Sequence, residues 1–286
     1  MTSTSSHPAL QPGGAAVITG GANGIGLASA IRFASFGMNV LIADRDREQL
    51  EVARNTLRDA AQSGATTEAQ LCDVSDASQV EQLAAFAKQS FGSVSVLMNN
   101  AGAGLNPGKP WENLDGWKKL LNINLWGVIH GVQAFVPTMI DAGKPGLVIN
   151  TGSKQGITRP PGNSAYNLSK AGVITFTEAL AHELRQLEDC PLSVHLLIPG
   201  FTYTGMISQF LPQKPEAAWT SEQVVEFMLK SLETNDFYIL CPDNDVTREM
   251  DERRIQWNAD DLIKNRPALS RWHADYTGAF EAFMKK

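Results

Sequence analysis

The chain has few of the features that mark several common classes of protein. Its three cysteines, Cys72, Cys190 and Cys241, are an odd number without metal-ligand spacing, which indicates a reduced compartment and no disulfide scaffold. Acidic residues outnumber basic ones by 30 to 24, for a net charge of −6, and this argues against nucleic acid or an anionic membrane surface as a partner. No apolar run approaches the length expected of a membrane span. We therefore expect a cytoplasmic protein.

The first residues also lack the pattern of a signal peptide. Residues 1–13 are rich in Ser, Thr, Pro and Gly, without a basic start or a long apolar core, so we predict a flexible tail. The whole chain is 43% hydrophobic and 19% charged, as in an ordinary globular protein. With no linker-like stretch in its middle, residues 14–286 are predicted to form one domain.

Short apolar runs alternate with helical patterns, which is typical of parallel βαβ units. The predicted strands are Ala15–Thr19, Asn39–Ala43, Ala69–Cys72, Val94–Met98, Leu147–Asn150, Ser193–Ile198 and Phe237–Leu240. The predicted helices are Gly24–Phe36, Arg47–Ala61, Ala77–Ser90, Leu114–Ile140, Ser164–Leu187 and Ser221–Glu233. This order predicts an α/β fold with a doubly wound parallel sheet and helices on both faces. Two segments depart from it: a loop-like insert at 202–220, and a helical C-terminal extension at 243–286 with a break near Pro267.

A glycine-rich turn follows the first predicted strand. Gly20, Gly24 and Gly26 lie between a Val-Ile-Thr strand end and a predicted helix, with Asn23 and Ile25 among them. Glycines let the backbone approach a pyrophosphate, and the helix N-terminus offers free N–H groups. The turn therefore predicts a dinucleotide site; a glycine turn without a ligand is the alternative.

Asp44 and Arg45 end the second predicted strand, eighteen residues past Gly26 in the case of Asp44. A carboxylate there can accept hydrogen bonds from the adenosine ribose and would repel a 2′-phosphate. At ~4 Å this repulsion is about 1 kcal/mol per unit charge in water and ~4 kcal/mol at a partly shielded surface. The adjacent guanidinium is a good phosphate partner, so we predict NAD and keep NADP open.

Two further strand ends are candidate parts of the cofactor site. Asp73 and Val74 follow the third strand and are equally compatible with adenine binding and with an ordinary helix N-cap region. The fourth strand closes on the turn Asn99–Gly102, of which we select Asn100, Ala101 and Gly102. Such a turn at the carboxyl edge of the sheet lies where ligands bind in this architecture.

Tyr166 and Lys170 are four residues apart on a predicted helix, so they share one face. A phenol has a pKa of about 10, and a neighbouring ammonium lowers that pKa toward working pH. Taken alone, such a pair also occurs on solvated helix faces. Ser153, thirteen residues earlier, is compatible with a strand-end turn residue, and Asn124 with a kink or a satisfied core amide.

Together these residues resemble the short-chain dehydrogenase/reductase family, in its compact single-domain branch. The matching elements, in the family's order and spacing over about residues 15–205, are TGGANGIG at 19–26, NNAG at 99–102, Asn124 in NINLWG, Ser153, YNLSK at 166–170 and PGFTYT at 199–204. The resemblance implies a Rossmann-type sheet of about seven strands and NAD(P)-dependent interconversion of a secondary alcohol and a ketone.

The resemblance also implies roles for individual residues. Tyr166 is the expected general acid/base, Lys170 is expected to lower its pKa and hold the nicotinamide ribose, and Asn124 to anchor a relay water. Ser153 is expected to hydrogen-bond the substrate oxygen, as donors aimed at a developing negative charge should. The expected contacts on the nicotinamide and phosphate side of the cofactor are Pro199, Gly200, Thr202 and Thr204. No histidine has the spacing of a metal site, so we expect no metal.

The substrate end is the least defined by sequence. Besides Ser153 and Tyr166, we select Gln155 and Tyr203 as substrate contacts; Lys154 and Gln155 are also compatible with a solvated loop. The insert carries several aromatic and apolar residues, which favours a hydrophobic or aromatic alcohol or ketone unless they serve only to pack the insert.

The family resemblance implies a homodimer or homotetramer, paired through helices 114–140 and 164–187, although the C-terminal extension departs from the family pattern. Two other functions remain open: a catalytically silent dinucleotide sensor, and a sugar-nucleotide epimerase or dehydratase.

Overall fold

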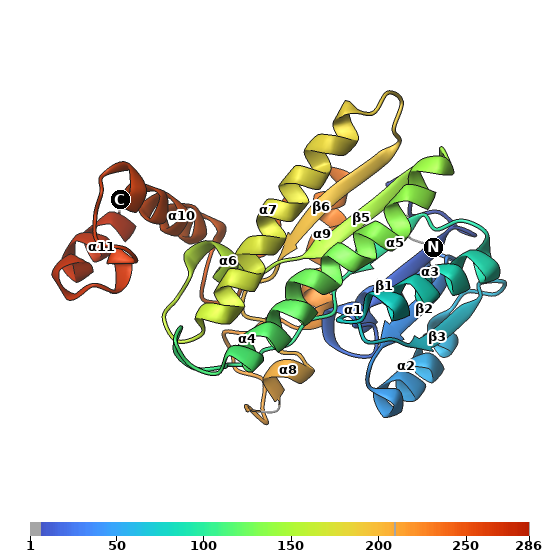
Figure 1. The fold of residues 1–286 in the computed structure, drawn as a ribbon, viewed down its shortest axis with the longest axis horizontal. Coiled ribbons are helices and arrows are strands. Elements are labelled where there is room, and N and C mark those ends of the chain that lie inside the picture. The colour runs from blue at the N-terminus through green and yellow to red at the C-terminus, as the bar shows by residue number, and fades with distance from the viewer. Residues whose placement is uncertain (1–6, 209, 286) are drawn as a thin grey trace.

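We analysed a computed structural model of the chain, which describes residues 7–208 and 210–285. Seven parallel strands form one sheet in the order β3-β2-β1-β4-β5-β6-β7 (Figure 1). Their bounds are β1 Ala15–Thr19, β2 Asn39–Asp44, β3 Thr67–Leu71, β4 Val96–Asn99, β5 Gly146–Thr151, β6 Leu192–Ile198 and β7 Tyr238–Leu240. The predicted strands are thus confirmed, with ends that differ by at most two residues.

The helices cover both faces of this sheet. In the body they are α1 Gly24–Ser35, α2 Arg47–Ala60, α3 Ala77–Phe91, α4 Leu114–Leu121, α5 Gly127–Asp141, α6 Lys154–Thr158, α7 Ser164–Gln186, α8 Gly205–Ser208 and α9 Ser221–Glu233. The extension holds α10 Arg248–Ile263, two 3-10 turns at Ser270–Trp272 and Ala274–Tyr276, and α11 Thr277–Met284. The helical extension with a break near Pro267 is therefore confirmed.

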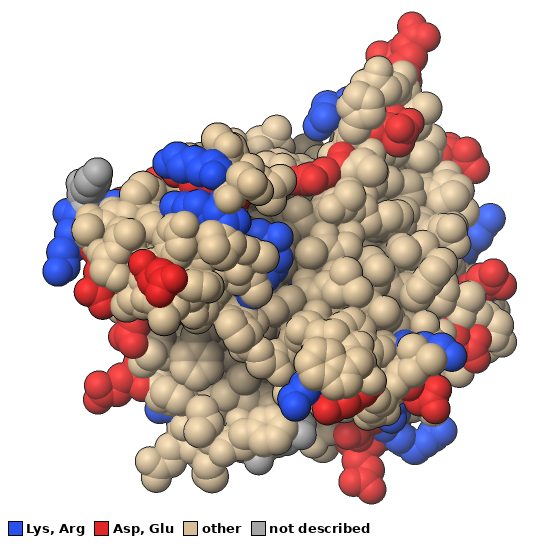
Figure 2. Space-filling view, turned by 60° about the vertical axis from the view of Figure 1, so that its left-hand side comes forward, with Lys and Arg blue, Asp and Glu red and all other residues tan. Residues whose placement is uncertain are grey.

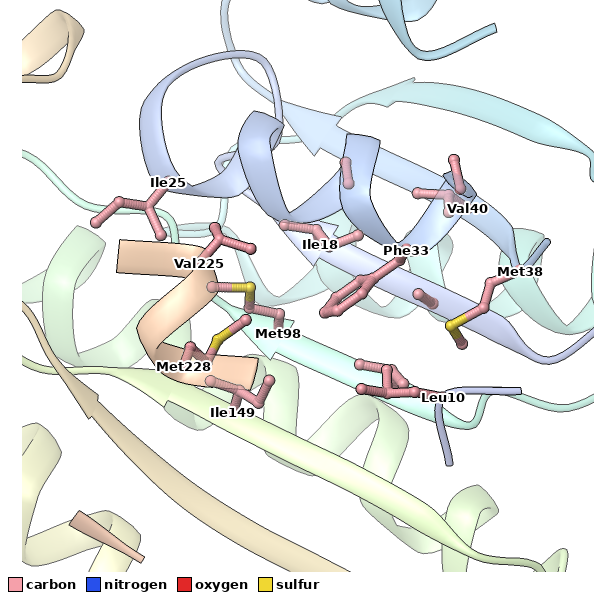
Figure 3. Close-up of a cluster of buried hydrophobic side chains, with 14 of the residues drawn as sticks. Leu10, Ile18, Ile25, Phe33, Met38, Val40, Met98, Ile149, Val225 and Met228 are labelled. Atoms are coloured by element: carbon pink, nitrogen blue, oxygen red, sulfur yellow. The ribbon is translucent and has the colours of Figure 1, made fainter. Parts of the chain in front are cut away.

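Two apolar cores lie on opposite faces of the sheet, because successive residues of a strand point to opposite sides. One core joins alternate strand residues such as Ile18 to α1, α2 and α9, as Figure 3 shows around Phe33 and Met228. The other joins residues such as Val17 to α3, α5 and α7. This two-sided burial is why the strands are almost continuously apolar.

Residues 7–13 do not form the predicted flexible tail. Ala9 and Leu10 are buried in the core beside α1, and the Leu10 backbone N–H donates to the His7 carbonyl at 3.0 Å. A few apolar side chains in a polar stretch are enough to dock it, which composition does not reveal. Residues 1–6 of the predicted tail lie outside the described residues.

The predicted helix 114–140 is interrupted. A π-helical segment, η1 Asn122–Trp126, separates α4 from α5. By length and composition alone the helical stretch Leu114–Asp141 is long and apolar enough to cross a membrane, although polar residues interrupt its apolar runs. Half of its most apolar window is buried inside the protein, where α5 packs on α3, and α4 and η1 pack on α7, as in a globular core.

The C-terminal extension projects from the body beyond α6 (Figure 1). Its own small core is built around Trp257, which is buried and packs edge-on against Phe280 and Phe283. The Arg266 guanidinium lies 3.9 Å from the centroid of the Trp257 ring and also pairs with Asp261 at 2.9 Å. The extension touches the body through α10 and α6.

Candidate active site

The carboxyl ends of β1 and β4 lie side by side where the strand order reverses, at the centre of the sheet. The Thr19 hydroxyl accepts hydrogen bonds from the backbone N–H groups of Asn100 and Ala101 at 3.1 and 3.2 Å. The Asn100 side-chain amide in turn donates to the Gly20 carbonyl at 3.1 Å. These bonds join the glycine turn and the turn after β4 into one unit at the position where such sheets bind ligands.

Glycines are required in the first turn by close packing. Gly20 has φ +63°, and a Cβ on it would lie 2.7 Å from the Ala101 Cα. A Cβ on Gly26 would overlap the Gly20 carbonyl oxygen. Helix α1 begins at Gly24, with the Asn23 side chain capping the Gly24 N–H. The result is a narrow backbone cradle at a helix N-terminus, which fits the pyrophosphate of a dinucleotide.

Asp44 lies under this cradle. One carboxylate oxygen accepts from the Ala22 N–H at 3.2 Å, and the other accepts from the Asp46 N–H at 3.2 Å. The carboxylate is therefore fixed beside the glycine turn, while the Arg45 side chain next to it is exposed. This arrangement holds a carboxylate beside the glycine turn.

Asp73 and Val74 lie on the neighbouring turn. Asp73 is not the N-cap of α3, since Asp76 holds that position. Instead its carboxylate accepts from the Ser75 N–H and hydroxyl at 2.9 and 2.7 Å. Val74 is buried, and its carbonyl is hydrogen-bonded to the ring of His130 at 2.9 Å. Asp73 thus orders the turn after β3, and Val74 joins it to α5.

Tyr166 and Lys170 point toward one another on α7. The Lys170 ammonium lies 5.9 Å from the centroid of the Tyr166 ring and donates to the Thr151 carbonyl at the end of β5, at 2.8 Å. No carboxylate within the described ranges forms an ion pair with it. Burial lowers the pKa of Lys170 to about 8, because a charge without a counterion is costly to desolvate.

The phenol differs from the sequence-based expectation. Burial raises the pKa of Tyr166, and a side-chain hydrogen bond with Ser153 acts in the opposite direction. The spacing of Tyr166 and Lys170 predicts instead that the ammonium lowers this pKa. Desolvation outweighs the Ser153 hydrogen bond, while the Lys170 ammonium donates to the Thr151 carbonyl.

Ser153 is held in place by two elements. Its hydroxyl oxygen accepts from the Gln155 N–H at 3.2 Å and so caps α6, and the same hydroxyl interacts with the Tyr166 phenol. Helix α6 lies directly on α7, where a Cβ on Gly156 would meet the Lys170 carbonyl carbon at 2.7 Å. The end of β5, α6 and α7 thus bring Ser153, Tyr166 and Lys170 together.

Asn124 lies in the π-helical segment and is fully buried. Its side chain accepts from the Ala103 N–H at 2.8 Å and donates to the Ala103 carbonyl and the Ser169 hydroxyl. A Cβ on Gly102 would lie 3.6 Å from Asn124 and 3.7 Å from the Lys170 ammonium. Asn124 is therefore both a satisfied amide and part of a kink, at the level of Lys170. A π-helical turn of this kind often accompanies a functional site.

The turn after β6 and the following lid, which we define as the described residues 201–208 and 210–220, cover the cradle. A Cβ on Gly24 would meet Thr204 at 3.1 Å, and one on Gly205 would meet Asn23 at 2.7 Å. Thr202 is buried and pairs with Trp219 in an isolated bridge. Pro199 accepts from the Lys154 N–H at 3.3 Å. This turn therefore lies between the cradle and Ser153.

The side chains of two predicted substrate contacts, Tyr203 and Gln155, form no hydrogen bond with Ser153 or Tyr166 within the described part of the chain. The Tyr203 hydroxyl donates to the Leu211 and Pro212 carbonyls at 3.1 and 3.0 Å, so it is used within the lid. The Gln155 side chain is exposed on α6. The Lys154 ammonium is turned away from solvent and pairs with Asp251 at 2.6 Å and Asp243 at 3.4 Å. The sequence analysis did not predict this contact. It also did not predict that Thr19 joins the two turns, which only its position between the first strand and the glycine turn could have indicated.

A family model described as short chain dehydrogenase matches residues 14–215. The chain belongs to the short-chain dehydrogenase family. It is 32% identical to a 1-deoxy-11-beta-hydroxypentalenate dehydrogenase of Streptomyces exfoliatus, over 91% of this chain and 94% of that protein. It is 33% identical to 3beta-hydroxysteroid dehydrogenase 1 of Eggerthella lenta, over 73% and 78% respectively.

Solved structures agree with this short-chain dehydrogenase fold. One from Burkholderia phymatum, in complex with NAD, is 30% identical with a TM-score of 0.79, covering 89% of this chain and 96% of that one. A metagenomic short-chain oxidoreductase in complex with NADP is 27% identical with a TM-score of 0.64, covering 81% and 98%. The chain is an NAD(P)-dependent oxidoreductase acting on the alcohol and ketone pair of a small molecule.

Proposed function

We propose that Tyr166 is the proton-transferring group of this dehydrogenase and that its substrate is a hydrophobic secondary alcohol or the corresponding ketone. The observation that carries the proposal is the grouping of Ser153, Tyr166 and Lys170 at the edge of the glycine cradle. The phenol and the serine hydroxyl interact with each other, so both can reach one substrate oxygen.

The chemistry divides between the cofactor and the chain. When bound, the nicotinamide takes up or supplies the hydride. In ketone reduction the Tyr166 phenol donates a proton to the carbonyl oxygen while Ser153 stabilises the developing negative charge. In alcohol oxidation the Tyr166 phenolate accepts the hydroxyl proton. The raised pKa of Tyr166 keeps the phenol protonated at neutral pH, which suits reduction.

Lys170 and Asn124 support this proton transfer. The Lys170 ammonium donates to the Thr151 carbonyl and has further N–H groups for the nicotinamide ribose hydroxyls. Its charge favours the phenolate of Tyr166 when the base form is needed. Asn124, beside Gly102 and Lys170, is the proposed anchor of a relay water.

The cofactor preference we propose is NAD. The support is Asp44, whose carboxylate is fixed beside the cradle by the Ala22 and Asp46 N–H groups. It can bind ribose hydroxyls and would repel a 2′-phosphate. Arg45 is exposed next to it and is the residue through which NADP would be accommodated.

A hydrophobic substrate is supported by the lid. Phe210 and Leu211 are exposed at the side of the lid beyond α8, and the surface is hollowed between the extension and the lid (Figure 2). Apolar walls with a few polar groups are typical of sites for apolar ligands. The relative from Eggerthella lenta, named for a hydroxysteroid, is in keeping with such a substrate.

We also propose a cytoplasmic homodimer or homotetramer. Exposed apolar side chains gather on α4, η1 and α7, which pack against one another: Leu114, Trp126 and Leu168 are all at least half exposed. Exposed apolar patches mark interaction sites, and these three side chains lie on elements that contact one another. Its place on the long helices supports pairing between copies of the chain.

The test uses purified protein, NAD or NADP and a panel of secondary alcohols and ketones, read by absorbance of the reduced nicotinamide. We expect turnover on hydrophobic substrates with NAD. Tyr166→Phe is expected to lower kcat by about 10²- to 10⁴-fold while cofactor binding is retained. Tyr276→Phe, which changes a tyrosine of the C-terminal extension, is the matched control and should keep most activity.

Three results would count against the proposal. A Tyr166→Phe variant as active as the parent would remove the acid/base. A tenfold preference for NADP would overturn the cofactor assignment. Cofactor binding without turnover on any substrate would instead indicate a silent dinucleotide sensor.

A further inference from the structure

A buried ion cluster joins the C-terminal extension to the residue next to Ser153. We define the junction cluster as Lys154, Asp243 and Asp251. The Lys154 ammonium lies 2.6 Å from an Asp251 oxygen and 3.4 Å from an Asp243 oxygen. The exposed fractions of the three side chains are 13%, 6% and 3%, so the charges are largely desolvated and each depends on the others.

Asp243 extends this junction to the nicotinamide side of the cleft. The oxygen that faces Lys154 also accepts from the Phe201 N–H at 3.2 Å. A Cβ on Gly200 would lie 2.7 Å from that oxygen and 3.0 Å from the Lys154 ammonium, so the ion pair rests directly on the turn. Asn244, the next residue, donates its N–H to the Ala217 carbonyl at 3.1 Å and so holds the returning end of the lid.

Helix α6 is fixed from two sides. On one side Gly156 lies against the Lys170 backbone. On the other, α10 contacts α6 through the Lys154–Asp251 pair and through Asn258, whose amide donates to the Ile157 carbonyl at 3.1 Å. Because α6 has only five residues, these contacts decide where it sits. Its N-cap is Ser153, so the position of the Ser153 hydroxyl follows that of α6.

We propose that Lys154, held by Asp243 and Asp251, is a positioning residue through which the C-terminal extension sets the placement of Ser153. Lys154 touches neither substrate nor cofactor in this role. The inference rests on the proposed function, since it concerns the alignment of the Ser153 hydroxyl with the Tyr166 phenol.

The test measures kcat and the cofactor dissociation constant for Lys154→Gln and Asp251→Asn. We expect kcat to fall by about 10- to 100-fold, the size of effect that a shift of about 1 Å produces, with cofactor affinity kept. Lys154→Arg should restore most of kcat, because a guanidinium can also bridge two carboxylates. In a Ser153→Ala background, Lys154→Gln should lower kcat no further, because it acts through Ser153.

Arg266→Gln is the matched control. It breaks the buried Arg266–Asp261 pair inside the extension but leaves α6 untouched. If it lowers kcat as much as Lys154→Gln does, the extension acts through general stability and the proposal is overturned. Additive effects of Ser153→Ala and Lys154→Gln, or unchanged kcat in both junction variants, would overturn it too.

Two further measurements keep these outcomes separate. Asp251→Asn leaves Lys154 paired with Asp243, so it carries the test if Lys154→Gln does not fold, as circular dichroism would show. Turnover by the parent protein decides the proposed function first. An active parent with the wrong pattern of variants refutes the positioning role alone, whereas an inactive parent that binds cofactor refutes both.

Discussion

Two lysines that are largely shielded from solvent lie on the adjoining helices α6 and α7 and have opposite surroundings. Lys170, on α7, is 4% exposed and has a backbone carbonyl as its hydrogen-bond partner. Lys154, at the start of α6, faces the carboxylates of Asp243 and Asp251. One ammonium is left without a counterion, and the other is neutralised.

The difference shows which lysine is placed for chemistry. Burial lowers the pKa of Lys170 to about 8, a cost that a purely structural residue would avoid by pairing or by being apolar. Around Lys154 the opposite holds: two carboxylates are brought out of water to meet it, and burial raises the pKa of Asp251 even so. A lone buried charge indicates function, while a paired one joins parts of the fold.

The largest effect is expected for Lys170→Met. Without the ammonium, kcat should fall by about 10²- to 10⁴-fold. At pH 7 both the folded and the unfolded chain carry a protonated Lys170, so folding bears the full desolvation cost. The drop in pKa from 10.5 to about 8 corresponds to about 3 kcal/mol. The variant should therefore be no less stable than the parent in denaturant unfolding, despite the lost bond to the Thr151 carbonyl.

Lys154→Met should instead lower the stability of the folded protein. It leaves the Asp243 carboxylate without its cation and Asp251 with only Arg254, 3.8 Å away, and is expected to lower the free energy of unfolding by about 3–5 kcal/mol. Lys264→Met is the matched control, because Lys264 is 59% exposed in its pair with Asp260 and its loss should change stability little. Equal losses of stability in Lys170→Met and Lys154→Met would remove the distinction between the two lysines.

The pH profile separates the two lysines without unfolding the protein. Values of kcat/KM report groups of the free enzyme, so for ketone reduction we expect a plateau near neutral pH and a decline as pH rises through about 8, where Lys170 loses its proton. Lys154→Arg should leave this decline in place. In Lys170→Arg the guanidinium stays charged, so any residual activity should persist to higher pH. A decline that moves with Lys154→Arg instead would contradict the assignment.

For alcohol oxidation the expected pH dependence runs in the opposite direction. Burial raises the pKa of Tyr166, and the base form is the one that accepts the alcohol proton. The rate of oxidation should therefore increase with pH from neutral values, until loss of the Lys170 proton opposes it.

The strands, the glycine turn and the grouping of the site residues were predictable, because each depends on a short pattern or on the order of motifs along the sequence. The seven strands and the cradle glycines follow from apolar runs and from a turn between strand and helix. The grouping of Ser153, Tyr166 and Lys170 came from motif order, and the structure brings these three together. Their individual roles stay predictions.

Features set by distant contacts were not predictable in this way. Lys154 meets Asp243 across 89 positions of sequence, and nothing near Lys154 marks it. Leu10 is buried by the body rather than by its polar neighbours. The π-helical turn at Asn122–Trp126 was not predicted, because the apolar pattern across it is the same as in one continuous helix. The pKa of Tyr166 depends on how deeply the phenol is buried, and the four-residue spacing to Lys170 gives no information about burial.

The smallest effect is expected for Gly200→Ala, which tests how tightly the paired lysine is held. A Cβ there would lie 2.7 Å from Asp243 and 3.0 Å from the Lys154 ammonium, so the ion pair must shift, at a cost of about 1–3 kcal/mol in unfolding free energy. Gly278→Ala is the matched control in α11, where a Cβ meets nothing within 4 Å and a helical alanine should be neutral or stabilising. Because Lys154 keeps both carboxylates in Gly200→Ala, kcat should fall less than in Lys154→Gln. If the two glycine variants behave alike, the junction is loose, and a paired lysine in it cannot hold Ser153 in place.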